Sequence, residues 1–158
     1  MIFTLATYTV IHVVISLVGI ASGLMVVLGM LVGKRLNGWT ELFLATTVAT
    51  SVTGFGFPFD HLLPSHIVGG ISLVVLAVAL FAVYGRQLAG VWRRIYVISA
   101  VMALYLNVFV LVVQAFLKVP NLKALAPTQS EWPFLLMQFI VLDMFITLGA
   151  LAAIKFRA

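Results

Sequence analysis

The residues of this 158-residue chain that are best suited to chemistry are its three histidines and an aspartate beside one of them. His12 lies inside a long apolar stretch, while Asp60, His61 and His66 fall in the segment FPFDHLLPSH. Neutral imidazole ligates haem iron, zinc and copper, and a carboxylate can complete a metal site. The candidate metal ligands are therefore His12, His61, His66 and Asp60.

One interpretation of this set is a single b-type haem between the first and third apolar segments. His12 and His66 would then be its axial ligands. Small residues near each histidine, Gly19 and Gly70 among them, would let the flat macrocycle lie close to the helices. This arrangement would give a redox centre near one face of the membrane.

Two other interpretations of the same residues stay open. A zinc or copper ion could be bound at the surface by Asp60, His61 and His66, since the D-H-x4-H spacing contains a proline and suits a loop. Alternatively, the histidines are polar residues that satisfy loop backbone and interfacial water, with His12 hydrogen-bonded across a helix bundle.

A second group of polar residues interrupts the later apolar segments. Asn107 and Gln114 share one face of the fourth segment, and Gln138 and Asp143 lie in the fifth. At about 1.5 Å per residue, Asn107 and Asp143 both reach the middle of a membrane and could bond directly. An ionised carboxylate at that depth costs at least about 2.5 kcal/mol, so Asp143 is expected to be protonated, paired or hydrated. These four residues predict either contacts between helices or a proton or ion pathway.

The composition indicates the elements that position these residues. Hydrophobic residues make up 64% of the chain and charged residues 8%, and the mean hydropathy is +1.25. Soluble domains carry about 25% charged residues, so this is an integral membrane protein and no nucleic-acid partner is expected. The absence of cysteine excludes disulfides, thiolate metal sites and covalent haem attachment. No H-E-x-x-H, G-x-S-x-G or P-loop motif indicates hydrolytic or nucleotide chemistry.

Five apolar segments are long enough to cross the bilayer as helices, which takes roughly 20 residues each. They cover residues 3–32, 40–57, 67–84, 95–117 and 134–154. The sequence therefore predicts an all-α, polytopic five-helix bundle that forms one domain over residues 1–158. With the N-terminus outside and the C-terminus inside, seven basic residues face the cytoplasm and only Lys118 and Lys123 lie outside, as the positive-inside rule requires.

Small and hydroxyl residues indicate how the predicted helices associate. Gly19 and Gly23 form a small-xxx-small pair, a common packing motif in membranes. The threonine-rich second segment is expected to be central. These stripes exceed what five short helices need internally, so a homo-oligomer or attachment to a larger membrane complex is expected.

Over SVTGFGFPFDHLLPSH, ALYLNVFVLVVQAF and LAPTQSEWPF the chain resembles small bacterial membrane proteins without an assigned function. The resemblance covers nearly the whole length. It implies a multi-pass protein of the bacterial inner (plasma) membrane, and it supplies no activity, cofactor or catalytic residue.

The leading functional expectation is a small membrane redox protein, with b-type haem or quinone-linked electron transfer near the periplasmic side. A non-enzymatic membrane subunit or scaffold is the first alternative, and a proton or ion pathway through the polar residues is the second. Whether the chain is an enzyme is left open by the sequence.

Overall fold

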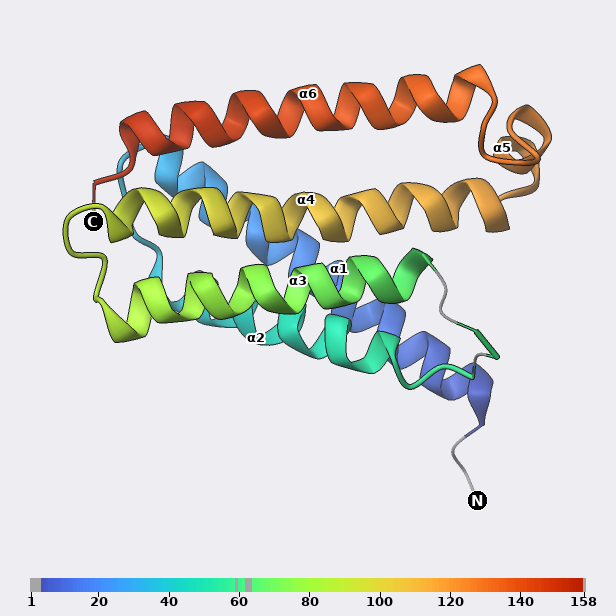
Figure 1. Cartoon of the computed structure of the whole chain (residues 1–158), viewed down its shortest axis with the longest axis horizontal. Coiled ribbons are helices and arrows are strands. Elements are labelled where there is room, and N and C mark those ends of the chain that lie inside the picture. The colour runs from blue at the N-terminus through green and yellow to red at the C-terminus, as the bar shows by residue number, and fades with distance from the viewer. Residues whose placement is uncertain (1–3, 59, 62–63, 158) are drawn as a thin grey trace.

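The computed structural model describes residues 4–58, 60–61 and 64–157, and all regular structure in these ranges is helical (Figure 1). The all-α prediction is confirmed. The helices are α1 (Leu5–Leu31), α2 (Asn37–Gly54), α3 (Pro64–Leu80), which continues into a π-helical turn η1 (Phe81–Gly85), α4 (Trp92–Lys118), the short α5 (Pro120–Leu125) and α6 (Trp132–Lys155).

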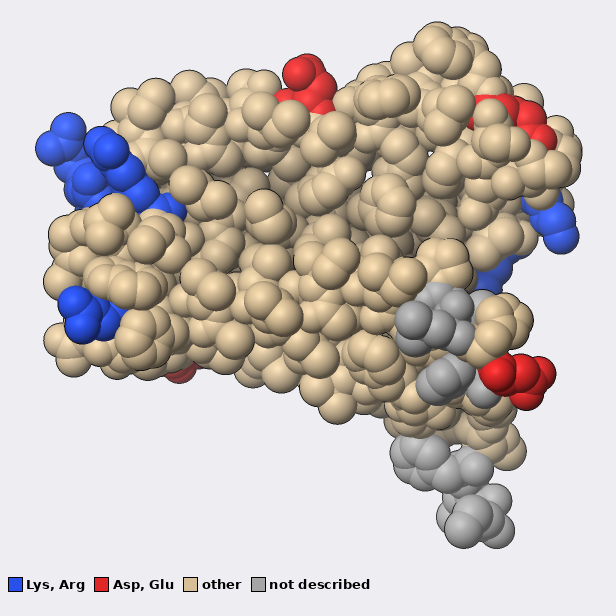
Figure 2. Space-filling view, in the orientation of Figure 1, with Lys and Arg blue, Asp and Glu red and all other residues tan. Residues whose placement is uncertain are grey.

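Four helices of the described chain are long and apolar enough to cross a membrane: α1, α3 with η1, α4 and α6. Even the shortest, the 22 residues Pro64–Gly85, covers about 33 Å, slightly more than the hydrocarbon core. The charged side chains gather toward the two ends of the molecule, and the surface between them is almost entirely uncharged (Figure 2). These features are those of a membrane protein. α2 is not among the four because hydroxyl side chains and Glu41 lower its hydropathy.

The helix starts follow from local chemistry. Thr4 caps α1, its hydroxyl accepting the Thr7 N–H at 3.2 Å. Pro64 and Pro120 are the first residues of α3 and α5, and Pro133 is the second residue of α6. Proline is tolerated in a first turn because the N–H that it lacks has no partner there. None of these prolines therefore kinks a span, and the one-and-a-half-turn α5 was not predicted.

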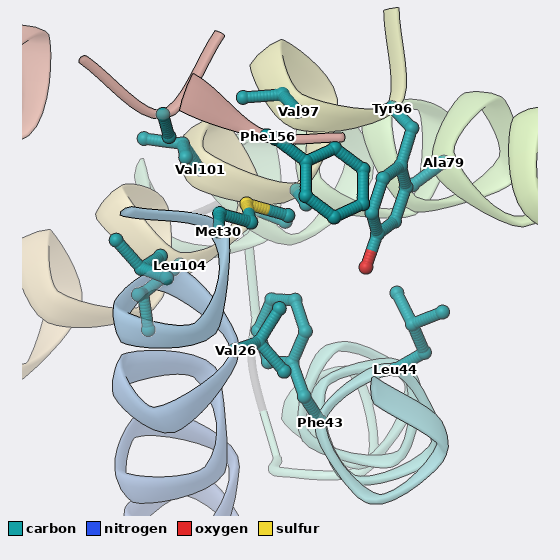
Figure 3. Close-up of a cluster of buried hydrophobic side chains, with 14 of the residues drawn as sticks. Val26, Met30, Phe43, Leu44, Ala79, Tyr96, Val97, Val101, Leu104 and Phe156 are labelled. Atoms are coloured by element: carbon teal, nitrogen blue, oxygen red, sulfur yellow. The ribbon is translucent and has the colours of Figure 1, made fainter. Parts of the chain in front are cut away.

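The central helix of the bundle is α4, and the expectation that the threonine-rich segment is central was wrong. α4 packs against α1, α3, α5 and α6, whereas α2 packs mainly against α1 and α3. Small side chains such as Ala100 and Ala103 on α4 are almost fully buried and let neighbours approach from several sides. The main core lies around the start of α4, where Phe156 folds back beyond α6 onto Tyr96 and Met30 (Figure 3).

α2 lies between α1 and α3, which have no extended contact with each other. Most of its hydroxyls donate to the carbonyl one turn earlier in the same helix, for example Thr46 to Leu42 O at 2.6 Å and Thr50 to Thr46 O at 2.8 Å. The polar side chains of α2 are thus largely satisfied within the helix itself.

Candidate functional sites

His12 is half-buried on α1, and its ring Nδ1 lies 2.7 Å from Thr53 Oγ1 on α2. The Thr53 hydroxyl already donates to Ala49 O at 2.6 Å, so its oxygen accepts a hydrogen bond from His12. We therefore infer that Nδ1 carries the hydrogen and that Nε2 keeps a free lone pair. The imidazole and the Phe57 ring also pack in a T-shaped arrangement, with ring centroids 5.1 Å apart.

Tyr8 joins the same contact one turn earlier on α1. Its hydroxyl donates to Thr53 O at 2.6 Å, and its ring meets Phe57 edge-on at 4.9 Å. A side chain at Gly56 would collide with the Tyr8 hydroxyl. Tyr8 and His12 are four residues apart and therefore share a face of α1, but Thr53 and Phe57 were not predicted as their partners. Their positions at the end of α2 and just beyond it gave no periodic signal.

The other predicted metal ligands lie on α3 and in the loop before it. His66 is buried in the first turn of α3, and its ring is tilted against Phe55 with centroids 5.6 Å apart. Asp60 and His61 are exposed in the preceding loop. Among the residues that the structure describes, no three His, Asp or Glu side chains lie close enough to hold a metal ion. The predicted four-residue metal centre is therefore not assembled there.

The predicted haem site also lacks geometric support, and it stays a prediction. His12 and His66 are carried by α1 and α3, and α2 lies between these helices. Gly19 faces protein: an added Cβ would lie 3.2 Å from the hydroxyls of Thr46 and Thr47. Gly70, by contrast, has open space beside it, with no atom within 4 Å of an added Cβ.

The polar residues of α4 and α6 do not form a continuous row. Asn107 is buried and donates to Ser16 O on α1 at 3.4 Å, while Gln138 donates to Phe109 O at 3.4 Å. Gln114 is half-buried on α4 and Asp143 is exposed on α6. The predicted bond between Asn107 and Asp143 was therefore wrong: the Asn107 amide faces α1, and Asp143 faces away from the bundle.

An apolar groove of about 400 Å³ lies over α4, between α3 and α6. Figure 2 looks onto this side of the molecule, where the surface is hollowed beneath the ridge formed by α6. Aliphatic side chains and Phe145 form most of the lining, and Tyr105 is its one residue with a polar side chain.

No family model, curated protein or solved structure matches the chain. Function is accordingly inferred from the geometry of the residues themselves, and the placement of Asp143 is the most unusual feature.

α6 has two faces. Its inner face is formed by the buried side chains Phe134, Val141, Phe145 and Ala152, and the helix packs on α4 and along part of α1. Asp143 lies on the opposite side, about 17 Å from either helix end. It makes no hydrogen bond or ion pair with the described part of the chain, and apart from Thr147 its neighbours on that surface are apolar. Figure 2 shows one acidic group midway along the ridge of α6, whose sole acidic residue is Asp143.

Proposed function

We propose that this chain is a non-enzymatic subunit of a membrane-embedded assembly and that it binds its partner through the outer face of α6. The observation that carries the proposal is the exposed carboxyl group of Asp143 at mid-membrane depth. A carboxylate facing lipid at that depth costs at least about 2.5 kcal/mol. A protein partner that supplies hydrogen bonds removes this cost.

The other ways of relieving the cost are weaker. Asp143 is too short to reach a membrane surface that lies about 17 Å away. Protonation removes the charge, but in lipid it leaves the carboxyl O–H and C=O without hydrogen-bond partners. The inner face of α6 already packs on α4, so relief has to come from outside the bundle.

We further infer five membrane crossings, with the N-terminus outside and the C-terminus inside a bacterial plasma membrane. Two features support this orientation. The described chain starts at one end of the bundle and finishes at the other (Figure 1). Basic side chains also gather at the end where α1 and α6 finish (Figure 2), while Lys118 is the last residue of α4 and Lys123 lies in α5, both at the opposite end. That asymmetry agrees with the positive-inside rule.

The test compares Asp143→Leu with Met144→Leu, which alters an adjacent exposed position without removing a polar group. Each protein is extracted from native membranes in a mild detergent, and its size is measured by native gel electrophoresis and light scattering. We expect the wild type and Met144→Leu to migrate as complexes larger than a monomer and Asp143→Leu to dissociate. A monomeric wild type, or a complex that is unaffected by Asp143→Leu, would refute the proposal.

A second candidate function rests on His12. Because Thr53 holds Nδ1–H, the imidazole is oriented as metal-bound histidines usually are, with Nε2 available. One b-type haem bound through Nε2 would make the chain a redox protein. Adding haem to the purified protein should then produce a Soret band that His12→Ala abolishes and His61→Ala retains. A spectrum that is identical for all three proteins would exclude this candidate.

A further inference from the structure

The outer face of α6 has a regular seam. Starting at Leu136, exposed residues recur at alternating intervals of four and three, namely Leu136, Ile140, Asp143, Thr147, Ala150 and Ile154. This is the 3.5-residue period of helices that pack along their length with knobs in holes. The seam lies opposite the buried face of the same helix, so the bundle does not use it.

Two polar side chains lie in the middle of this seam. Consider the positions of the described helices that lie more than two turns from either helix end. Among these, the exposed polar residues are Asp143 and Thr147. Thr147 also differs from the threonines of α2: its hydroxyl makes no hydrogen bond within the described structure, whereas theirs mostly bond one turn back. Both groups are thus free to bond across an interface at the same depth.

We propose that the partner on this face is a second copy of this chain, and that two α6 helices pack in parallel along the seam. The inference rests on the proposed function and names its partner. Two copies with the same membrane orientation are related by an axis along the membrane normal, so the α6 helices run in the same direction. Each seam residue then meets its own counterpart, and the two Asp143 side chains lie opposite each other.

A second copy supplies the hydrogen-bond partners that Asp143 lacks within the described chain. The partner's carboxyl group and Thr147 hydroxyl lie at the same depth, and the other polar side chains near the middle of the described helices are buried or half-buried. Hydrogen bonds that the two Asp143 side chains make with each other and with the Thr147 hydroxyls would replace those that lipid does not supply. Ala150 lets the helices approach closely one turn beyond Thr147, since small residues favour such contacts.

The absence of cysteine from the chain permits a direct test by single-cysteine crosslinking in native membranes. Ile140→Cys, Thr147→Cys and Ala150→Cys probe the seam. Leu135→Cys on another side of α6 and Val74→Cys on α3 are matched exposed controls. After mild oxidation we expect disulfide-linked dimers from the three seam variants and none from the two controls.

Adding Asp143→Leu to Ile140→Cys should reduce the dimer fraction, because one or two interhelical hydrogen bonds correspond to roughly a three- to thirty-fold change in association. Asp143→Asn, which can still donate and accept, should retain crosslinking. Crosslinking at Val74→Cys, or equal crosslinking at all positions, would refute the proposal that two copies pack along the seam of α6. If no seam variant crosslinks while the native complex still depends on Asp143, the partner is a different protein and only this inference fails; a monomer refutes the proposed function as well.

Discussion

Gly23→Ala is expected to weaken the contact among α1, α2 and α4. A Cβ at this position would lie 2.7 Å from Leu104 Cδ1 and 2.8 Å from Phe43 Cδ1. Both neighbours are almost completely buried and cannot swing away. Inserting a methyl group into such a core typically costs about 1–3 kcal/mol.

The same substitution also has a favourable component, since alanine is better than glycine in a helix by up to about 1 kcal/mol. Gly70→Ala isolates that component, because an added Cβ there meets no atom within 4 Å on α3. The free energy of unfolding of Gly23→Ala should therefore lie about 1–3 kcal/mol below that of Gly70→Ala.

The measurement is the loss of helical circular dichroism as SDS is titrated into mixed micelles, with both variants and the wild type compared under identical conditions. Gly70→Ala should be as stable as the wild type or slightly more stable. If the two variants unfold at the same SDS fraction, the contact of Gly23 with Leu104 and Phe43 does not exist as described, and the packing role of this glycine is refuted.

Three further outcomes are expected. Thr53→Val removes the acceptor of His12 Nδ1–H and should lower stability by about 1–2 kcal/mol in the same assay, whereas Thr50→Val, which loses only a bond within α2, should change it less. Phe156→Ala removes a fully buried ring beyond α6 and should cost about 3–5 kcal/mol, seen as faster proteolysis of the C-terminal segment. The hydroxyl and N–H of Thr128 hold the pKa of Glu131 below its ordinary value of 4.5, so the loop before α6 is stabilised at neutral pH and loses that stabilisation as the pH falls through the lowered pKa. The protection factor of the Thr128 amide, which is the intrinsic exchange rate at each pH divided by the observed rate, should then fall in acid, and Glu131→Gln should remove this pH dependence.

The helical architecture was predictable because a single physical requirement of the membrane outweighs the others. Backbone groups in lipid have to bond internally, so apolar runs of sufficient length become helices. Trp92 and Trp132 begin α4 and α6, and Pro64 begins α3. These residues mark helix starts for reasons that are local in sequence.

The arrangement of the helices was less predictable. The threonines of α2 indicated a central helix, but a hydroxyl that bonds its own preceding turn needs no neighbour. The buried alanines of α4 let several helices pack closely around it, so α4 is central instead. Small apolar residues do not stand out in a sequence this hydrophobic, so this position was not predictable from them. Helical spacing correctly puts Asp143, Thr147 and Ala150 on one face. It cannot say whether that face meets α4 or the outside, because apolar residues occupy both sides of α6.

The hydrogen bonding of α2 reconciles two observations that otherwise conflict. By length and composition four helices of the described chain are suited to lipid, yet the distribution of basic residues favours an odd number of crossings. Hydropathy counts each threonine as a polar group exposed to hydrocarbon, but Thr46, Thr50 and Thr53 bond to carbonyls of α2. Buried Thr47 faces Gly19 on α1, so protein shields much of this helix from lipid. A helix of this kind needs less hydropathy to cross a membrane than an isolated one, which supports α2 as the fifth crossing.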